Sequence, residues 1–379
     1  MVKKILAFYL LICFSVAYAQ TTVVDSIFTG GIYRTYRLYV PAIYNGSSAR
    51  PLILNMHGYT SNALAQQAYS NFMPIADTAN FLMVYPQGTT YNSQPFWNAG
   101  ISSTLVDDIS FLSDLIDSLS LQYNINSNRI YATGMSNGGF MSHTLACELS
   151  NRIAAIASVT GSIFTTQFGS NCHPTRPVPV LQISGTSDGT VPYAGNTTMQ
   201  PIDSVVKYWV NYNNCNSTPS FSNVPNTNTT DGCTAEHYRY LNGNSGSSVE
   251  LYKIIGGGHT WPGSPYTTGV TNRDMNASKE IWRFFNKYSL NTLTTIEYLS
   301  AERSKFLVYP NPSLSEIHLL FDKQVNSKYI VVLTDVLGKQ TELELKDNKV
   351  NLDNLSSGVY VMSLFENGLA VAQTKVIKQ

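Results

Sequence analysis

The chain has 379 residues, of which 43% are hydrophobic and 13% are charged, and its 24 basic and 24 acidic residues balance. This length leaves room for two domains, one of them with a sizeable core. The sparse, balanced charge argues against nucleic acid or an anionic membrane surface as a partner, because both attract a basic face.

The first 19 residues have the pattern of a signal peptide. Lys3 and Lys4 precede an apolar run over residues 5–16, and Ala17-Tyr18-Ala19 forms a small-x-small cleavage site. The run is shorter than the roughly 20 residues that a helix needs to cross a bilayer. We therefore expect residues 1–19 to be removed on export, leaving a protein without a transmembrane segment in the medium or on the cell surface.

Residues 20–288 alternate between strand-like and helix-like segments. Short apolar runs that end at glycine are typical of buried parallel strands, and the segments between them carry apolar residues at helical spacing. The alternation predicts an α/β catalytic domain with a doubly wound, mostly parallel sheet and helices on both faces. The expected strands are 51–58, 81–88, 129–134, 154–161, 178–185 and 249–258, and the expected helices are 106–123, 138–149, 201–213 and 277–288.

The pattern changes after Tyr288. Residues 289–304 are polar and irregular, and we expect them to form a linker. Residues 305–379 hold only short β-like runs separated by turn residues, among them "IHLLF", "YIVVLTD" and "VYVMSLF". This spacing predicts a small all-β sandwich as the second domain, with His318 on a strand face.

A serine lies between two glycines in "GMSNG", residues 134–138. A strand-like run precedes this pentapeptide and a helix-like run follows it, which is the context of a nucleophile elbow. In that turn Gly134 and Gly138 avoid clashes, and Ser136 takes a strained backbone conformation at a helix N-terminus that favours developing negative charge. The alternative is a glycine-rich turn with an incidental serine, and the flanking elements favour the elbow.

A nucleophilic serine needs a base and a carboxylate that orients the base. In doubly wound hydrolases these follow the serine in the order Asp or Glu, then His, on loops after strands. Asp188 and His259 satisfy this order, each just past an expected strand end. Their alternative roles are a turn residue before Gly189 for Asp188 and a loop histidine for His259.

The loop that contains His57 follows an expected strand upstream of the serine. Its His-Gly pair is typical of a loop that supplies an oxyanion donor, so we assign the two donors to the backbone N–H groups of Tyr59 and Asn137. His57 itself is expected to support the loop. The remaining candidates are read as structural: helix-capping Asp107 and Asp108, the distant His143, and the loop residues His173 and His237.

Three aromatic residues lie beside these loops: Trp97, Tyr193 and Trp261. Each is a candidate for a substrate-binding wall that stacks on a phenolic or sugar group, and the alternative is a place in the core.

Four cysteines remain once the signal peptide is removed, and four cysteines allow three connectivities. Cys215 and Cys233 bracket a polar loop that a disulfide would stabilise, so we expect these two to pair. Cys147 is then paired with Cys172 by default. The chain has no close Cys-x-x-Cys or His-x-x-x-His pair, and we expect neither a metal nor a cofactor.

The motifs "GMSNGGFMSHTLAC", "SGTSDGTVPY" and "GGGHTWPG" resemble those of the secreted polyhydroxybutyrate depolymerase and feruloyl or acetylxylan esterase family of the α/β-hydrolase fold, over roughly residues 30–288. This resemblance implies a catalytic triad of Ser136, Asp188 and His259. The tail segments "YPNPS", "VVLTDVLGKQ" and "LSSGVYVMSLFENG" resemble type IX secretion sorting domains, which implies the secretion machinery as a partner.

These features predict a secreted serine carboxylic-ester hydrolase that acts on feruloyl or acetyl esters of plant polysaccharide. The alternative substrate is a polyester of the polyhydroxybutyrate class. A serine peptidase and a non-catalytic carbohydrate-binding surface protein are less favoured, the second because all three triad residues are present.

Overall fold

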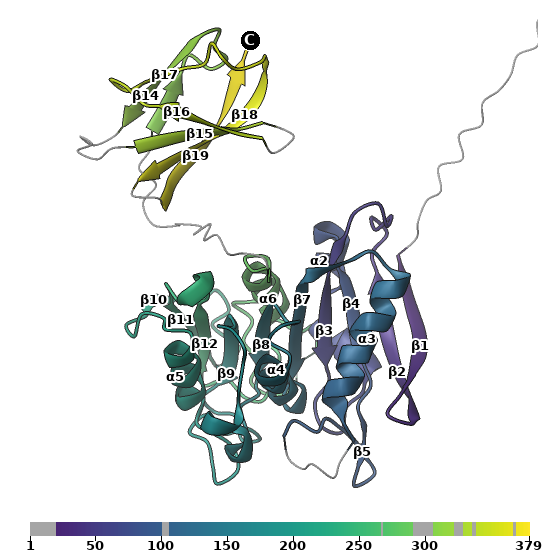
Figure 1. Ribbon diagram of the computed structural model, residues 1–379. Coiled ribbons are helices and arrows are strands. Elements are labelled where there is room, and N and C mark those ends of the chain that lie inside the picture. Colours follow the sequence, from purple (N-terminus) through teal and green to yellow (C-terminus); the bar gives the residue numbers. More distant parts are fainter. Residues whose placement is uncertain are drawn as a thin grey trace, which may run out of the picture. The chain divides into compact units, whose positions relative to one another are not determined.

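The computed structural model describes residues 20–100, 106–266, 268–290, 306–321, 329–335, 339–366 and 369–379 (Figure 1). The chain divides into two compact units, residues 1–293 and 294–379. The expected signal peptide and all but two residues of the expected linker lie outside the described residues.

The first unit is built on one ten-stranded sheet, which confirms the predicted α/β class. Its central strands are parallel, because each of the pairs β4–β3, β3–β7, β7–β8, β8–β9 and β9–β12 runs in the same direction. Two antiparallel strands flank the centre on each side and were not predicted. In sheet order the strands are β1 (Thr21–Thr29), β2 (Ile32–Val40), β4 (Leu82–Pro86), β3 (Arg50–Met56), β7 (Ile125–Met135), β8 (Ala155–Val159), β9 (Val180–Gly185), β12 (Val249–Ile255), β11 (Thr234–Tyr240) and β10 (Ser220–Asn223).

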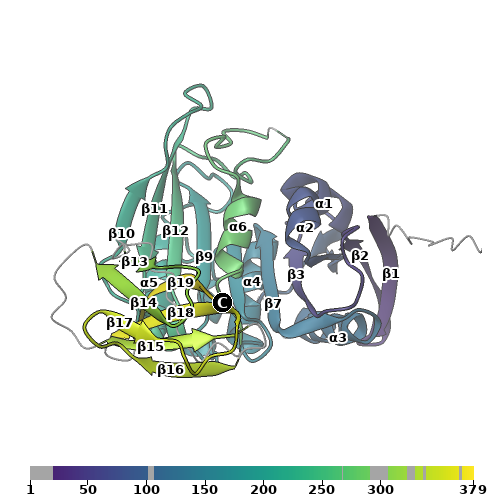
Figure 2. The ribbon, with the colours of Figure 1, turned by 90° about the horizontal axis from the view of Figure 1, so that it is seen from above.

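Helices cover both faces of this sheet (Figure 2). The first core cluster takes buried side chains from α3 (Asp108–Gln122), α4 (Asn137–Glu148) and α5 (Ile202–Tyr212). The second takes them from the opposite group, α1 (Ala63–Ser70), α2 (Met73–Ala79) and α6 (Ala277–Phe285). No helix among the described residues is both long and apolar enough to cross a membrane.

Shorter elements complete the first unit. A small hairpin pairs β5 (Thr89–Tyr91) with β6 (Gln94–Phe96), and three single-turn helices are η1 (Thr165–Gln167), η2 (Gly169–Asn171) and η3 (Asn244–Gly246).

The acidic pair at the start of α3 is structural, as predicted. The Asp107 side chain caps the helix by accepting a hydrogen bond from the Ser110 backbone N–H at 2.9 Å. Asp108 is buried and forms an ion pair of 2.6 Å with the equally buried Arg34.

The second unit is a sandwich of two antiparallel sheets, as predicted. One sheet has the order β13 (Phe306–Tyr309), β14 (Glu316–Phe321) and β17 (Lys349–Asn351), with His318 on β14. The other has the order β16 (Gln340–Glu344), β15 (Tyr329–Thr334), β18 (Gly358–Glu366) and β19 (Leu369–Lys378). Side chains of both sheets share one core, which includes Ile317, Leu333 and Met362.

Candidate active site

Ser136 occupies a sharp turn between β7 and α4. Its φ of 53° and ψ of −120° lie outside the regions that a non-glycine residue usually occupies, so the turn is strained as an elbow requires. The Ser136 N–H donates to the Val159 carbonyl at 2.8 Å, and the Ser136 carbonyl accepts from the Phe140 N–H at 3.0 Å. The first bond ties the turn to the end of β8, and the second begins α4.

The glycines around the elbow are required by close packing. A Cβ atom at Gly138 would lie 2.1 Å from the Met56 carbonyl oxygen, at the end of β3. A Cβ atom at Gly134 would lie 2.5 Å from the Gly138 carbonyl carbon. Neither approach leaves room for a side chain, which agrees with the reason that the sequence motif gave for both positions.

Asp188 and His259 meet in the structure. Asp188 follows β9 and His259 follows β12, and the carboxylate Oδ2 lies 2.7 Å from the imidazole Nδ1. The second carboxylate oxygen accepts backbone N–H bonds of 2.8 Å from Thr190 and from Val191. Asp188 is therefore buried and held on both oxygens, and one ring nitrogen of His259 is occupied by it.

All three residues lie at one edge of the sheet. Strands β7, β8, β9 and β12 are adjacent and parallel, so their carboxyl ends share that edge. Backbone bonds join neighbouring loops there, including the Ser187 N–H to the Gly257 carbonyl at 2.9 Å. The fold thus brings the predicted serine, aspartate and histidine to the same edge of the sheet in the first unit.

The loop after β3 passes directly beside the elbow. A Cβ atom at Gly58 would lie 3.4 Å from the Ser136 Cβ. Within the described part of the chain, the backbone N–H groups of Tyr59 and Asn137 donate no hydrogen bond to the protein. These are the two groups predicted as oxyanion donors, and both remain available to an anion beside Ser136.

Trp97 lies in the core, which differs from its expected place in a substrate-binding wall. Its ring is completely buried, and its indole N–H donates to the His57 carbonyl at 3.0 Å. Its backbone bonds the side chain of Asn137. Trp97 therefore presents no surface to a substrate and instead braces two loops of the site.

Trp261 is also in the core, with 1% of its surface exposed. Its indole N–H donates to the Ser278 hydroxyl at 3.0 Å, so the side chain packs toward α6. Tyr193 is half-buried, and its hydroxyl donates to Asp203 at 2.6 Å. Of the three aromatic candidates, only Tyr193 retains exposed surface.

Two of the remaining histidines are neutral supports. Burial lowers the pKa of His57 to about 4, and its Nε2 accepts the Gly88 N–H at 3.0 Å. Burial likewise lowers the pKa of His143 to about 4. His237 lies on β11 rather than in a loop, where its Nε2 lies 2.7 Å from the buried carboxylate of Glu250.

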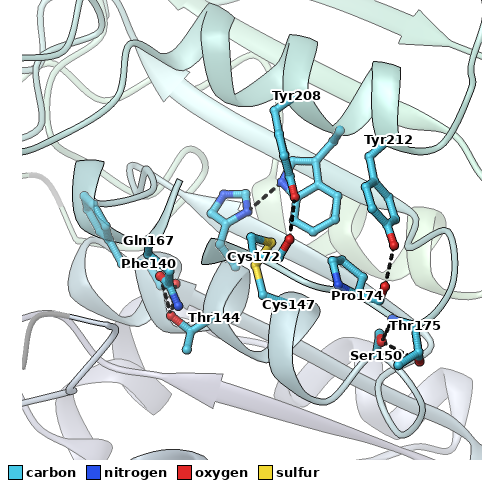
Figure 3. The surroundings of a disulfide bond; sticks show 12 residues. Phe140, Thr144, Cys147, Ser150, Gln167, Cys172, Pro174, Thr175, Tyr208 and Tyr212 are labelled. Atoms are coloured by element: carbon cyan, nitrogen blue, oxygen red, sulfur yellow. Dashed lines mark hydrogen bonds between the residues drawn. A yellow bond between two sulfur atoms is a disulfide. The ribbon is translucent and has the colours of Figure 1, made fainter. Parts of the chain in front are cut away.

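One of the two expected disulfides is present. Cys147, in the last turn of α4, is bonded to Cys172 (Figure 3). The carbonyl of Cys172 also accepts a hydrogen bond of 3.1 Å from Tyr208, and Thr144 of α4 donates to Gln167 at 3.0 Å (Figure 3). The helix that begins beside Ser136 is therefore anchored at its other end.

The predicted Cys215–Cys233 disulfide is wrong, because both residues are free thiols. Cys215 packs against the core on the α5 side of the sheet, whereas Cys233 belongs to the core on the α6 side. The sheet separates the two sulfur atoms. The described residues also hold no group of three or more His, Cys, Asp or Glu side chains arranged for a metal ion.

The elbow, the buried Asp–His pair and the order of the strands define the first unit as an α/β-hydrolase. Residues 41–219 match the phospholipase/carboxylesterase family. Residues 307–379 match the secretion system C-terminal sorting domain. The second match confirms the resemblance of the tail to sorting domains, and sequence relatives that include a feruloyl esterase and a poly(3-hydroxyalkanoate) depolymerase confirm the resemblance of the first unit.

Several carboxylic-ester hydrolases are similar in sequence. A bifunctional acetylxylan esterase/xylanase of Neocallimastix patriciarum is 28% identical over 69% of this chain and 34% of its own length. Feruloyl esterase B of Piromyces equi is 30% identical over 58% of this chain and 41% of its own. A poly(3-hydroxyalkanoate) depolymerase of Paucimonas lemoignei is 26% identical over 57% of this chain and 56% of its own length. The chain thus spans less than half the length of the first two.

A solved structure shows the same fold. The acetyl xylan esterase from Aspergillus awamori superimposes with a TM-score of 0.51 and 14% identity, over 70% of this chain and 99% of that one.

Proposed function

We propose that the protein is a serine carboxylic-ester hydrolase that acts through Ser136, Asp188 and His259. The observation that carries this proposal is the 2.7 Å Asp188–His259 bond at the same sheet edge as the strained Ser136. Because Nδ1 of His259 faces the carboxylate, Nε2 is the nitrogen that remains for the serine hydroxyl.

Acylation begins with attack of the Ser136 hydroxyl on the ester carbonyl, while His259 Nε2 accepts the hydroxyl proton. Asp188 keeps the imidazole in the required tautomer and stabilises its charged form. The N–H groups of Tyr59 and Asn137 bind the oxyanion, each contributing on the order of 3 kcal/mol in the transition state. The intermediate then expels the alcohol, which takes the proton from His259.

Deacylation repeats these steps with water as the nucleophile. His259 accepts a proton from the water as it attacks the acyl-enzyme, and returns it to Ser136 when the carboxylic acid leaves. The reaction consumes one ester and one water and needs no cofactor.

We propose feruloyl or acetyl esters of plant polysaccharide as substrates, since two of the related enzymes are named for those activities. A polyhydroxyalkanoate polyester is the second candidate, which the similarity to a depolymerase favours. For the second unit we propose type IX export to the cell surface or the medium, which the match of residues 307–379 to a sorting domain supports.

Labelling with a fluorophosphonate and ester kinetics test the proposal on the full chain. We expect one label per chain, absent from Ser136→Ala, and a fall in kcat of about 10⁵-fold or more in that variant. Near-normal turnover by Ser136→Ala, or labelling that survives the substitution, would contradict the triad. The ratio of kcat/KM on methyl ferulate to that on a soluble 3-hydroxybutyrate oligomer separates the substrates, and we expect it to exceed about ten.

A further inference from the structure

A small hairpin that the sequence analysis did not predict lies beside the oxyanion loop. Strands β5 and β6 are joined by Asn92 and Ser93, which have φ values of 50° and 62°. A two-residue turn with two positive φ values is typical of tight hairpins. The hairpin immediately precedes Trp97, which is fixed in the core.

Hydrogen bonds at both ends join this hairpin to the loop after β3. The Gly88 N–H, just before β5, donates to Nε2 of His57 at 3.0 Å. The Thr60 N–H donates to the Pro95 carbonyl of β6 at 3.0 Å. The hairpin is therefore held against residues 57–60, the segment in which Gly58 lies beside Ser136.

Three aromatic rings meet where the loop and the hairpin join, and we call them the aromatic platform: Tyr59, Tyr91 and Phe96. The Phe96 ring is nearly buried and lies 6.2 Å from the Tyr59 ring and 5.2 Å from the Tyr91 ring. The two tyrosines remain 44% and 39% exposed. Phe96 thus supports two half-exposed rings, and one of them, Tyr59, directly follows Gly58.

The two segments that carry these rings contain no formally charged residue. Residues 57–70 and 86–100 contain no Asp, Glu, Lys or Arg. Exposed aromatic side chains on uncharged segments favour a neutral, planar ligand, which they bind through ring contacts and a tyrosine hydroxyl. Neither segment supplies a counter-ion for a charged acyl group.

We propose that the aromatic platform binds the aryl ring of a hydroxycinnamoyl ester whose carbonyl lies at Ser136. This proposal rests on the proposed function and narrows its substrate to aromatic acyl groups. Tyr59 supplies both a proposed oxyanion donor and one ring of the platform, so an ester held at Ser136 lies within reach of these rings. The platform thereby takes the role that the sequence had suggested for Trp97 and Trp261.

The test compares three neutral esters with the full chain: methyl ferulate with an aryl acyl group, phenyl acetate with an aryl alcohol, and methyl butyrate with no ring. Tyr91→Leu should lower the ratio of kcat/KM on methyl ferulate to that on methyl butyrate by roughly 3- to 10-fold, as expected for one aromatic contact. Tyr59→Leu should do the same. Binding of methyl ferulate to Ser136→Ala should weaken by a similar factor when Tyr91→Leu is added.

The matched control is Phe221→Leu, which removes another half-exposed ring, on the edge strand β10. It should leave all three esters unaffected. An unchanged ratio in the tyrosine variants, or a loss confined to phenyl acetate, would overturn the platform as an acyl site. Loss of hydrolysis of all three esters by the unmodified protein would instead contradict the proposed function.

Discussion

The side chain of Asn137 holds the main chain of Trp97 through two hydrogen bonds. The Trp97 N–H donates to Asn137 Oδ1 at 2.7 Å, and Asn137 Nδ2 donates to the Trp97 carbonyl at 3.0 Å. Asn137 directly follows Ser136, the proposed nucleophile, and the Trp97 indole donates to the carbonyl of His57, in the loop that carries the other predicted oxyanion donor. One buried amide therefore links both predicted oxyanion donors.

Asn137→Ala should lower kcat by about 10- to 100-fold with little change in KM. The substitution keeps the backbone N–H of residue 137 but removes the side chain that fixes its position and, through Trp97, the position of the Tyr59 N–H. Small displacements of oxyanion donors lower kcat by about this factor. Steady-state kinetics on a soluble ester measure the effect.

The control for Asn137→Ala is Thr144→Val, which removes a buried hydrogen bond to Gln167 farther along the same helix. It should lower stability without lowering kcat. If both variants lose activity in proportion to their stability, the side chain of Asn137 has only a structural role.

Asp188→Asn should lower kcat by about 10⁴-fold while the protein stays folded. An amide at this position can accept the Thr190 and Val191 N–H bonds, but it then turns its NH₂ group toward His259 Nδ1 and favours the wrong tautomer. The measurement is kcat across pH, with circular dichroism as the check on folding. A loss below about tenfold would show that His259 does not depend on this carboxylate.

The sequence predicted which residues meet at this edge of the sheet better than it predicted which aromatic side chains are exposed there. Ser136, Asp188 and His259 are marked by local signals, namely glycines at fixed offsets and positions just past strand ends. The direction of a loop side chain is set by tertiary packing, so the neighbour of His259 in sequence, Trp261, turns into the core. The aromatic platform could not be predicted for the same reason, because Tyr59 and Tyr91 come together only through tertiary packing against Phe96.

Disulfide pairing shows the same limit. The loop between Cys215 and Cys233 looked like one that needs a clamp, and loop composition was the only signal that the sequence offered. The pairing fails because the ends of the loop reach opposite faces of the sheet. Local sequence also failed to predict the flanking antiparallel strands. In β10, for example, all four residues are exposed, so the strand lacks the apolar alternation that would mark it.

Removing the Cys147–Cys172 disulfide should destabilise the first unit by about 3 kcal/mol. The bridge closes a loop with a sequence separation of 25, and loop closure of that size restricts the unfolded chain by roughly this amount. Denaturant unfolding of Cys147→Ala/Cys172→Ala against the unmodified protein measures the difference.

Cys215→Ala is the matched control, since it removes a sulfur atom but no disulfide. It should lower the free energy of unfolding clearly less than removal of the Cys147–Cys172 bridge. Burial raises the pKa of the Cys215 and Cys233 thiols to about 11, so both should react slowly with a thiol reagent at pH 8 until the protein is unfolded. A second native disulfide, detected as protected cysteines after unfolding without reductant, would contradict this assignment.

The stability of the first unit should fall as the pH falls from about 6.5 to 4. His143 is completely buried, its Nε2–H donates to Gln182 at 3.0 Å, and its Nδ1 accepts from Trp209 at 3.2 Å. Burial lowers its pKa to about 4, so in this window the unfolded chain binds a proton that the folded protein does not. By linkage the free energy of unfolding then rises with pH and levels off above about 6.5, with a change of about 2 kcal/mol between pH 4.5 and 7 from this residue.

His143→Asn removes the titrating group and should reduce that pH dependence by about 2 kcal/mol, leaving the contribution of His57. Ser142→Ala, which deletes a buried hydrogen bond on the same helix, should lower stability equally at both pH values. Chemical denaturation at pH 4.5 and pH 7 distinguishes the two variants. A loss of stability that is equal at both pH values for His143→Asn, as for Ser142→Ala, would mean that the pKa of His143 is the same in the folded and the unfolded chain, against the linkage argument.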